Sequence, residues 1–488
     1  MNNRGRITVF LSLMVGIMLI LAMTAISIID KYMAKSKLAM CSRTAVSGVM
    51  AQYNSYIYEH YHILLFDTNQ SGKGEGYIEE SIIDNLNTNL GADYQVEAVA
   101  ISEFTYLWSD DCEELKQQIK DYAGYAALEY TAELILDKTG GEDGTLAPEI
   151  LQDIESAGAA DTQADNSTAG AADTQPDDST AGATGTQTDN SNTKSDTDDP
   201  RKLTGKLTGL GLLTVVLPDD IELSDRVLGV DEQTSRSMTG LFSFDFSLNN
   251  SFDSYSKFKD DISSHSVWKD SLIDVGVGVA YAAQVFNCAT EQDVNDTSVL
   301  KCELEYLIGG KSSDAANIKS VVNRIIAIRL PVNYSFLMSD NVKSSELSTL
   351  ATSLMAVTGI PSPILKRLLA GAWAYVEAVA EIRNLMAGSK LAFKKTASNW
   401  ITDLDNLSES MYSTCEEDDK GLSYKDYLLI LLAMDMDKGY MRMLDLIQLN
   451  TRETEADFNI KNAAVAISVD ISVTHDGTKY GFKESVEY

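Results

Sequence analysis

A phosphate-binding loop is the first chemistry that the sequence suggests, in the stretch G-G-K-S from Gly309 to Ser312. In such a loop, successive backbone N–H groups curl around the phosphates, which requires another glycine five positions before the Gly-Lys pair. That position holds Glu305, so the required geometry fails. A turn that enters a helix capped by Ser312 or Ser313 explains the same residues.

The histidines and cysteines do not form a metal-binding pattern. His60 and His62 are two positions apart, which puts them on different sides of a helix, and His265 and His475 lie far away in the sequence. The five cysteines include no C-x-x-C pair. The ligand spacing of a transition-metal site is therefore missing, and we predict no such site.

Carboxylate groups are the remaining candidates. Asp435, Asp437 and Gly439 match part of a calcium loop, but the third acidic ligand and the terminal Glu of such a loop are misplaced. A pair such as Asp110-Asp111 is expected by chance in a chain with 72 acidic residues. No G-x-S-x-G, H-E-x-x-H or kinase-like set is present. The sequence therefore predicts no catalytic, cofactor-binding or metal-binding residues, no cofactor and no enzyme.

The strongest structural signal is an apolar segment near the N-terminus. From Ile7 to Ile29 there is no charged residue. As a helix this segment is about 35 Å long, which exceeds the roughly 30 Å of a bilayer's hydrocarbon core. A cleaved signal peptide usually has a shorter apolar region and a small-residue cleavage site, whereas this segment runs directly into Asp30. We predict a retained membrane anchor with the lipid bilayer as its first partner.

The apolar pattern continues beyond Asp30 as a stripe with helical spacing. The stripe consists of Ala34, Leu38, Cys41, Ala45, Val49, Tyr53, Ile57, Tyr61 and Leu64. No proline interrupts it. The simplest expectation is one helix that leaves the membrane and enters a soluble domain, and the alternative is two helices with a break near Asp30.

The residues from Arg4 to Phe10 read R-G-R-I-T-V-F and open this helix. This start, with its amphipathic continuation rich in small residues, resembles the TadE/TadG-like pseudopilins of tight-adherence (Flp) pilus loci. Most of the remaining chain is similar to a large bacterial group that shares this N-terminus. The similar stretches are residues 305–314, 372–377, 424–428 and 443–448. The resemblance implies a cell-envelope role with pilin helices and pilus-assembly membrane proteins as partners.

The sequence departs from the pilin pattern at the processing site. Pilins of this class are cut after a glycine and keep a Glu at the fifth position, but the fifth residue after Gly5 is Phe10. A permanently anchored accessory subunit fits this departure better than a polymerising pilin. The positive charges after the anchor outnumber those before it, which favours a cytoplasmic domain, whereas the resemblance implies an extracytoplasmic one. We follow the resemblance.

Charge and cysteine content narrow the class of protein further. The net charge of −33 argues against nucleic-acid binding, which needs a basic face that this balance of charges does not supply. Five cysteines leave one unpaired, so buried free thiols are expected, with a Cys288–Cys302 disulfide as the alternative in an oxidising compartment. A chain of 488 residues is expected to form two or three domains.

Periodicity predicts an α+β fold, mostly helical and with a small antiparallel sheet. Helices are expected over residues 77–90, 112–138, 270–289, 317–330, 345–357, 364–386, 424–434 and 439–448, and strands over 94–101, 212–217 and 464–474, with 480–488 pairing across a turn at Asp476-Gly477. Residues 302–308 fit either state. The segment 364–386 contains five charged residues, so it is expected to be a core helix and not a second membrane span.

Residues 156–199 differ from the rest. They repeat every twelve residues around a Thr-Gln pair and carry almost no large apolar side chain, so they are expected to be a disordered linker. The expected order is a cytoplasmic tail (1–6), a transmembrane helix (7–29), a pilin-like helix with a small α+β domain (30–155), the linker (156–199) and a larger α+β domain (200–488).

These features favour a membrane-anchored, non-enzymatic cell-envelope protein, namely a minor pseudopilin or accessory subunit of a tight-adherence type pilus or secretion system. The alternative is an anchored extracytoplasmic glycan-binding protein or hydrolase that uses a carboxylate pair in a cleft of residues 201–488.

Overall fold

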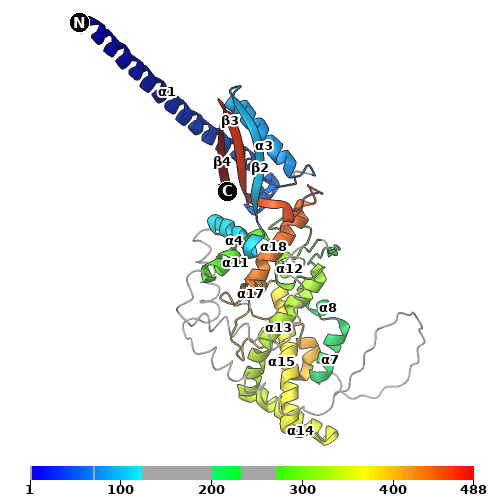
Figure 1. The fold of residues 1–488 in the computed structure, drawn as a ribbon. Helices are drawn as coiled ribbons and strands as arrows, with labels where there is room; N and C mark the ends of the chain where they lie inside the picture. Colours follow the sequence, from blue (N-terminus) through cyan, green and yellow to red (C-terminus); the bar gives the residue numbers. More distant parts are fainter. Residues whose placement is uncertain (1–2, 70–71, 124–199, 231, 234–270, 417) are drawn as a thin grey trace, which may run out of the picture. The chain divides into compact units, whose positions relative to one another are not determined.

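The computed structural model describes residues 3–69, 72–123, 200–230, 232–233, 271–416 and 418–488. The fold is α+β, as expected, with a long N-terminal helix, many further helices and one small antiparallel sheet (Figure 1). The chain forms two compact units. Of the described residues, the first unit contains those up to 122, residues 232–233 and residues 440–488, and the second unit contains the others between them. The linker expected at 156–199 lies outside the described residues.

Helix α1 (Asn3–Met50) is one continuous helix, so the alternative of a break near Asp30 is wrong. The expected continuation as far as Leu64 is also wrong. The helix ends at Met50, and a separate helix α2 (Ser55–Tyr61) follows. The local reason is Asn54, whose side chain accepts a hydrogen bond from the N–H of Ile57 and so starts a new helix.

The second half of α1 packs in the first unit with α3 (Glu75–Leu90) and the sheet. The sheet contains β1 (Phe66–Asp67), β2 (Tyr94–Tyr106), β3 (Ala463–His475) and β4 (Thr478–Glu487). Strand β3 pairs antiparallel with the other three. Its alternate side chains from Val465 to Val473 are buried against the helices, which confirms the predicted strand.

The hairpin between β3 and β4 is also confirmed. Asp476 and Gly477 both have positive φ, 47° and 69°, which matches the twist of a two-residue hairpin turn. Since β3 pairs along its whole length with β2, the C-terminal strands belong to the first unit. The division of the chain therefore differs from the expected single domain over residues 200–488. A pairing between residues so distant in sequence is decided by the fold and not by local composition.

Helix α4 (Ser109–Ala123) belongs to the first unit, and its continuation expected to 138 lies outside the described residues. Its first residues are unusual, because Asp110, Asp111 and Cys112 all have positive φ, between 48° and 64°. A left-handed turn of three residues with side chains is strained.

The second unit is helical in its described residues. It contains α7 (Pro200–Leu210), α8 (Leu213–Val216), α11 (Ser271–Val285), α12 (Glu303–Gly309), α13 (Asp314–Ser339), α14 (Asn341–Thr358), α15 (Ser362–Met386), the 3-10 turn Leu404–Asn406, α16 (Leu407–Ser410) and α17 (Tyr424–Ala433). Helix α18 (Met436–Thr451) begins here and continues into the first unit, where the 3-10 turn Ile460–Asn462 precedes β3.

Two sequence expectations concern this unit in particular. The strand expected at 212–217 is wrong, because this run forms the short helix α8, which stops before Pro218. A short apolar run has no periodicity that separates a buried strand from a buried helix. The second expectation, that 364–386 is a core helix, is confirmed: from Leu369 to Met386 the side chains of α15 are mostly buried within the unit.

Candidate functional site

The stretch Gly309 to Ser312 is a connection between two helices. Gly310 ends α12 in the left-handed conformation, and Ser313 caps α13, as one of the two predicted caps. The side-chain amide of Asn317 accepts from the N–H of Lys311 at 2.7 Å and donates to the Lys311 carbonyl at 3.1 Å. This amide takes the backbone donor that a phosphate would need, so the turn is structural.

Each histidine that the structure describes stacks on a different tyrosine. The ring of His60 stacks on Tyr56, that of His62 on Tyr122 and that of His475 on Tyr94, with centroids 4.1–4.2 Å apart. Within the described residues, no three His, Cys, Asp or Glu side chains are placed to hold a metal ion. His265 lies outside the described residues.

The acidic candidates have local roles. Asp435 pairs with Lys438 at 2.8 Å at the junction between α17 and α18, which is the helix–helix turn favoured over a calcium loop. Asp110 and Asp111 lie in the strained start of α4. The five cysteines are free thiols, of which Cys112, Cys288 and Cys302 are buried.

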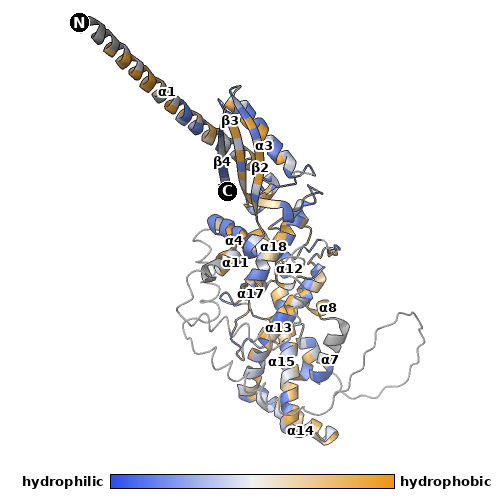
Figure 2. Cartoon of the chain, in the orientation of Figure 1, coloured by the Kyte–Doolittle hydropathy of each residue, from blue (hydrophilic) through white to orange (hydrophobic). Residues whose placement is uncertain are grey.

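The first half of α1 is the largest exposed apolar surface in the described residues (Figure 2). Its large side chains are open to solvent from Phe10, which is 64 % exposed, to Met33, which is 66 % exposed. Near its centre, the hydroxyl of Thr24 donates to the carbonyls of Ile20 and Leu21 in the same helix. This half of the helix is long and apolar enough to cross a membrane.

Burial on α1 begins sharply at Ala34 and continues at Leu38, Ala45 and Val49, four residues of the predicted stripe. Polar contacts join both ends of this second half of α1 to the rest of the first unit. Lys37 donates to the carbonyl of Leu90 at the end of α3 at 2.6 Å, and the Tyr488 hydroxyl donates to the carbonyl of Met50. The second half of α1 is therefore an integral part of the first unit.

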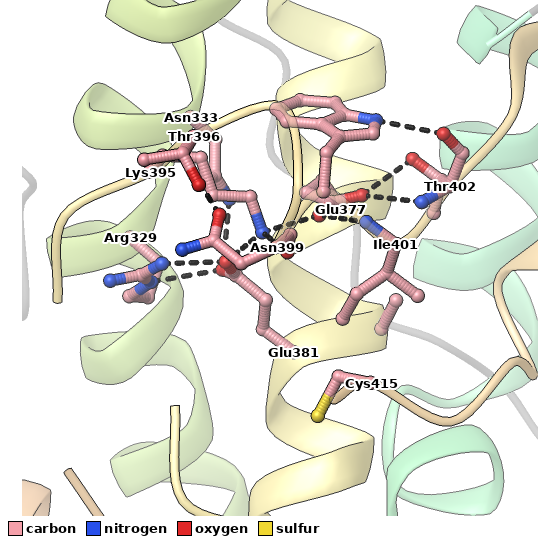
Figure 3. Close-up of polar contacts among 12 residues, drawn as sticks. Arg329, Asn333, Glu377, Glu381, Lys395, Thr396, Asn399, Ile401, Thr402 and Cys415 are labelled. Atoms are coloured by element: carbon pink, nitrogen blue, oxygen red, sulfur yellow. Dashed lines mark hydrogen bonds and ion pairs between the residues drawn. The ribbon is translucent and has the colours of Figure 1, made fainter. Parts of the chain in front are cut away.

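The most elaborate polar arrangement lies inside the second unit and is shown in Figure 3. We call it the charge network and define it as Arg329 and Asn333 of α13, Glu377 and Glu381 of α15, and Lys395 of the following loop. All five side chains are buried, none of the residues being more than 8 % exposed. The two acidic and two basic side chains balance each other in formal charge.

Glu381 is the centre of the charge network. Its carboxylate accepts from Arg329 Nη2 at 2.6 Å and Nε at 2.9 Å, from Lys395 Nζ at 2.7 Å and from Asn333 Nδ2 at 2.9 Å. Burial by itself raises the pKa of Glu381, but the two cations outweigh it and hold the pKa well below the ordinary value. The side chain is therefore an ion at neutral pH and has no proton to give.

The carboxylate of Glu377 accepts as many hydrogen bonds as that of Glu381. It accepts from Lys395 Nζ at 2.6 Å, from the N–H groups of Ile401 and Thr402 at 2.8 and 2.9 Å, and from the Thr402 hydroxyl at 2.6 Å. The indole of Trp373 in turn donates to that hydroxyl at 2.8 Å. The two carboxylates thus fix the loop after α15 to the helix, and no donor or acceptor of the pair is directed to a substrate.

A second buried carboxyl behaves differently. Glu305 of α12 accepts one hydrogen bond, from the N–H of Ala289 at 2.9 Å, and its other oxygen has no partner. The Tyr424 hydroxyl is near enough to affect its pKa but is outside hydrogen-bond geometry. Burial without a cation raises the pKa of Glu305 to about 7. This carboxyl is therefore partly protonated near neutral pH.

Sequence reasoning did not single out any of these buried residues as a site. A signal was present, because Glu377 and Glu381 are one helical turn apart in an otherwise apolar helix, which predicts that both face one buried partner. Nothing in the sequence identified that partner. Arg329 and Lys395 come from different elements, and only the tertiary fold brings them to the same carboxylate.

Comparison with known proteins gives one match. A family model described as a family of unknown function, DUF5702, matches residues 190–475, more than half of the chain. The matched range includes the charge network and excludes α1. No curated protein and no solved structure matches the chain.

Proposed function

We propose that this chain, which belongs to the DUF5702 family of unknown function, is a membrane-anchored, non-enzymatic cell-envelope protein. More specifically, we propose that it serves as a minor pseudopilin or accessory subunit of a tight-adherence type pilus or secretion system. Its bulk is then extracytoplasmic, and its partners are the lipid bilayer, pilin helices and pilus-assembly membrane proteins.

The observation that carries this proposal is the division of α1 into two halves with no break between them. From Phe10 to Met33 every large apolar side chain is exposed, whereas from Ala34 onward one face is buried in the first unit. Exposed apolar side chains on all sides of a helix need lipid or other apolar helices around them. A continuous helix that is packed into a folded unit at one end can have its other end in lipid or among other apolar helices.

Close contact with another membrane helix is easiest where α1 carries small residues. Nothing in the structure approaches the position of a Cβ on Gly16, so a neighbouring helix could come close to the backbone there. Ala22 and Ala25 are the next small residues along the membrane half. These positions are where we place the contact with pilin helices.

The alternative, a surface hydrolase or glycan-binding protein, needs a carboxylate pair that faces a cleft. One pair of carboxylates that the fold brings together, Glu377 and Glu381, shares Lys395 and is saturated with hydrogen bonds. A glycosidase needs one carboxyl that gives a proton and a second one that faces the sugar.

The membrane part of the proposal is tested by extraction of the native chain with alkaline carbonate. We expect the intact chain to stay in the membrane pellet and to require detergent for release. Release by carbonate, or a mature product that begins after Asp30, would overturn the anchor.

The pilus part is tested in cells with the substitution Gly16→Leu and the matched control Leu19→Ile. We expect Gly16→Leu to remain in the membrane but to lose co-purification with pili, because the larger side chain blocks close helix contact. The control should behave as the parent. Normal pilus assembly and adhesion after deletion of the gene would remove the proposed role altogether.

A further inference from the structure

A second exposed apolar surface lies where α14 meets α15. We call it the α14–α15 tip. It consists of Met355, Val357, Ile360, Ile364 and Leu368, which are 40, 84, 37, 52 and 52 % exposed. Although 23 % of the chain is charged, no charged residue occurs between Leu347 and Leu365. A solvated segment as long as residues 347–365 would ordinarily carry several charged side chains.

The tip has a defined shape. Gly359 takes the left-handed conformation with φ of 73° at the end of α14, and Pro361 precedes α15, so the two helices meet at 119°. Leu347 and Ala351 are buried, which leaves the outer sides of the helices exposed. The tip therefore projects outward as a convex corner at the end of the second unit, apolar in Figure 2.

The charges around the tip are basic, in contrast to the rest of the chain. Lys366 and Arg367 lie between Ile364 and Leu368, and no acidic residue occurs from Leu347 to Val376, whereas the whole chain has a net charge of −33. Lys366 donates to the Ser344 hydroxyl at 2.6 Å, which holds one cation between the two helices. Arg367 is exposed beside Leu368.

We propose that the α14–α15 tip inserts into the interfacial layer of a lipid bilayer with anionic headgroups. A convex apolar corner with basic residues at its base fits a bilayer surface, where the apolar side chains enter the acyl boundary and the cations meet lipid phosphates. This contact is separate from the α1 anchor and would hold the second unit at a membrane surface.

A second copy of the chain is the less favoured occupant. Two convex corners bury little area against each other, and the strongly acidic chains repel one another. A bilayer can deform around the corner, so it needs no preformed groove.

The test uses the full chain in vesicles of phosphatidylcholine and phosphatidylglycerol, made with or without brominated acyl chains, which quench nearby tryptophan. The variants are Ile364→Trp at the tip and Val227→Trp at a position outside it that is 67 % exposed in the parent chain. We expect brominated lipid to remove about half of the added emission of Ile364→Trp and none of that of Val227→Trp. Quenching should weaken in phosphatidylcholine alone.

Two further variants separate the explanations. Adding Val357→Glu and Leu368→Glu to Ile364→Trp should abolish the quenching, while the melting temperature stays unchanged because both side chains are exposed. Emission of Ile364→Trp that is unaffected by brominated lipid in every mixture would overturn the proposal. A blue shift that depends on protein concentration but not on bromine would also overturn it, because another protein chain would then cover the tip.

Discussion

Replacing Glu381 by glutamine tests whether the charge network holds the second unit together. The substitution removes one of two anions and leaves Arg329 and Lys395 to share Glu377, which forms an ion pair with Lys395 but not with Arg329 in the structure. The glutamine can accept on one oxygen, but its amide N–H groups then face donors. Breaking a buried pair by removing one partner costs about 3–5 kcal/mol, and we expect the free energy of unfolding to fall by that amount.

The assay is urea unfolding of the full chain in detergent, followed by tryptophan fluorescence. Trp373 and Trp400 contact each other edge to face at 5.5 Å, and Trp373 is joined to Glu377 through Thr402, so both report on this region. The matched control is Glu346→Gln, which removes a partly exposed pair with Lys343 at 3.6 Å. A pair of that kind contributes at most about 1 kcal/mol.

A double substitution makes the test sharper. Lys395→Met removes one cation, so Glu381→Gln with Lys395→Met restores the balance of formal charge. We expect the double variant to be less destabilised than the sum of the single variants by more than about 1 kcal/mol. Strict additivity, or a loss for Glu381→Gln no larger than that for Glu346→Gln, would refute the conclusion that the charge network holds α13, α15 and the loop together.

Three more predictions use the same unfolding assay. Burial raises the pKa of Glu305 to about 7 from 4.5, so the folded state binds its proton more tightly and the free energy of unfolding falls as pH rises from about 4.5 to 7. Glu305→Gln should remove this loss, so its free energy of unfolding relative to the parent should rise by about 3 kcal/mol from pH 5 to pH 8. The same difference from the parent at both pH values would contradict the assignment. Asp111→Gly should stabilise the first unit by about 1 kcal/mol, because glycine relieves a φ of 55°, whereas destabilisation would show that the turn is unstrained. Gly421→Ala should lower the free energy of unfolding by at least about 2 kcal/mol, since its Cβ would lie 2.6–2.8 Å from the backbone of Leu391. The control Gly371→Ala has open space around it in α15 and should raise the free energy of unfolding by up to about 1 kcal/mol.

Local sequence pattern was sufficient to predict an element where neighbouring residues alone determine it. The lack of charge from Ile7 to Ile29 predicted a helix that fits a membrane, alternation predicted β3, and Asp476-Gly477 predicted the hairpin. The stripe from Ala34 also predicted which face of α1 is buried. Each signal depends only on neighbours along the chain, namely on periodicity, hydropathy or turn chemistry.

The tertiary structure decided what depends on residues far apart in sequence. The pairing of β2 with β3 joins the two ends of the chain in one unit, and composition carries no record of a partner more than 300 residues away. The end of α1 at Met50 was missed because the apolar stripe continues through α2, although the backbone does not. The charge network follows the same rule: sequence placed Glu377 and Glu381 on one face of a helix, and only packing against α13 supplied the cations that make their burial possible.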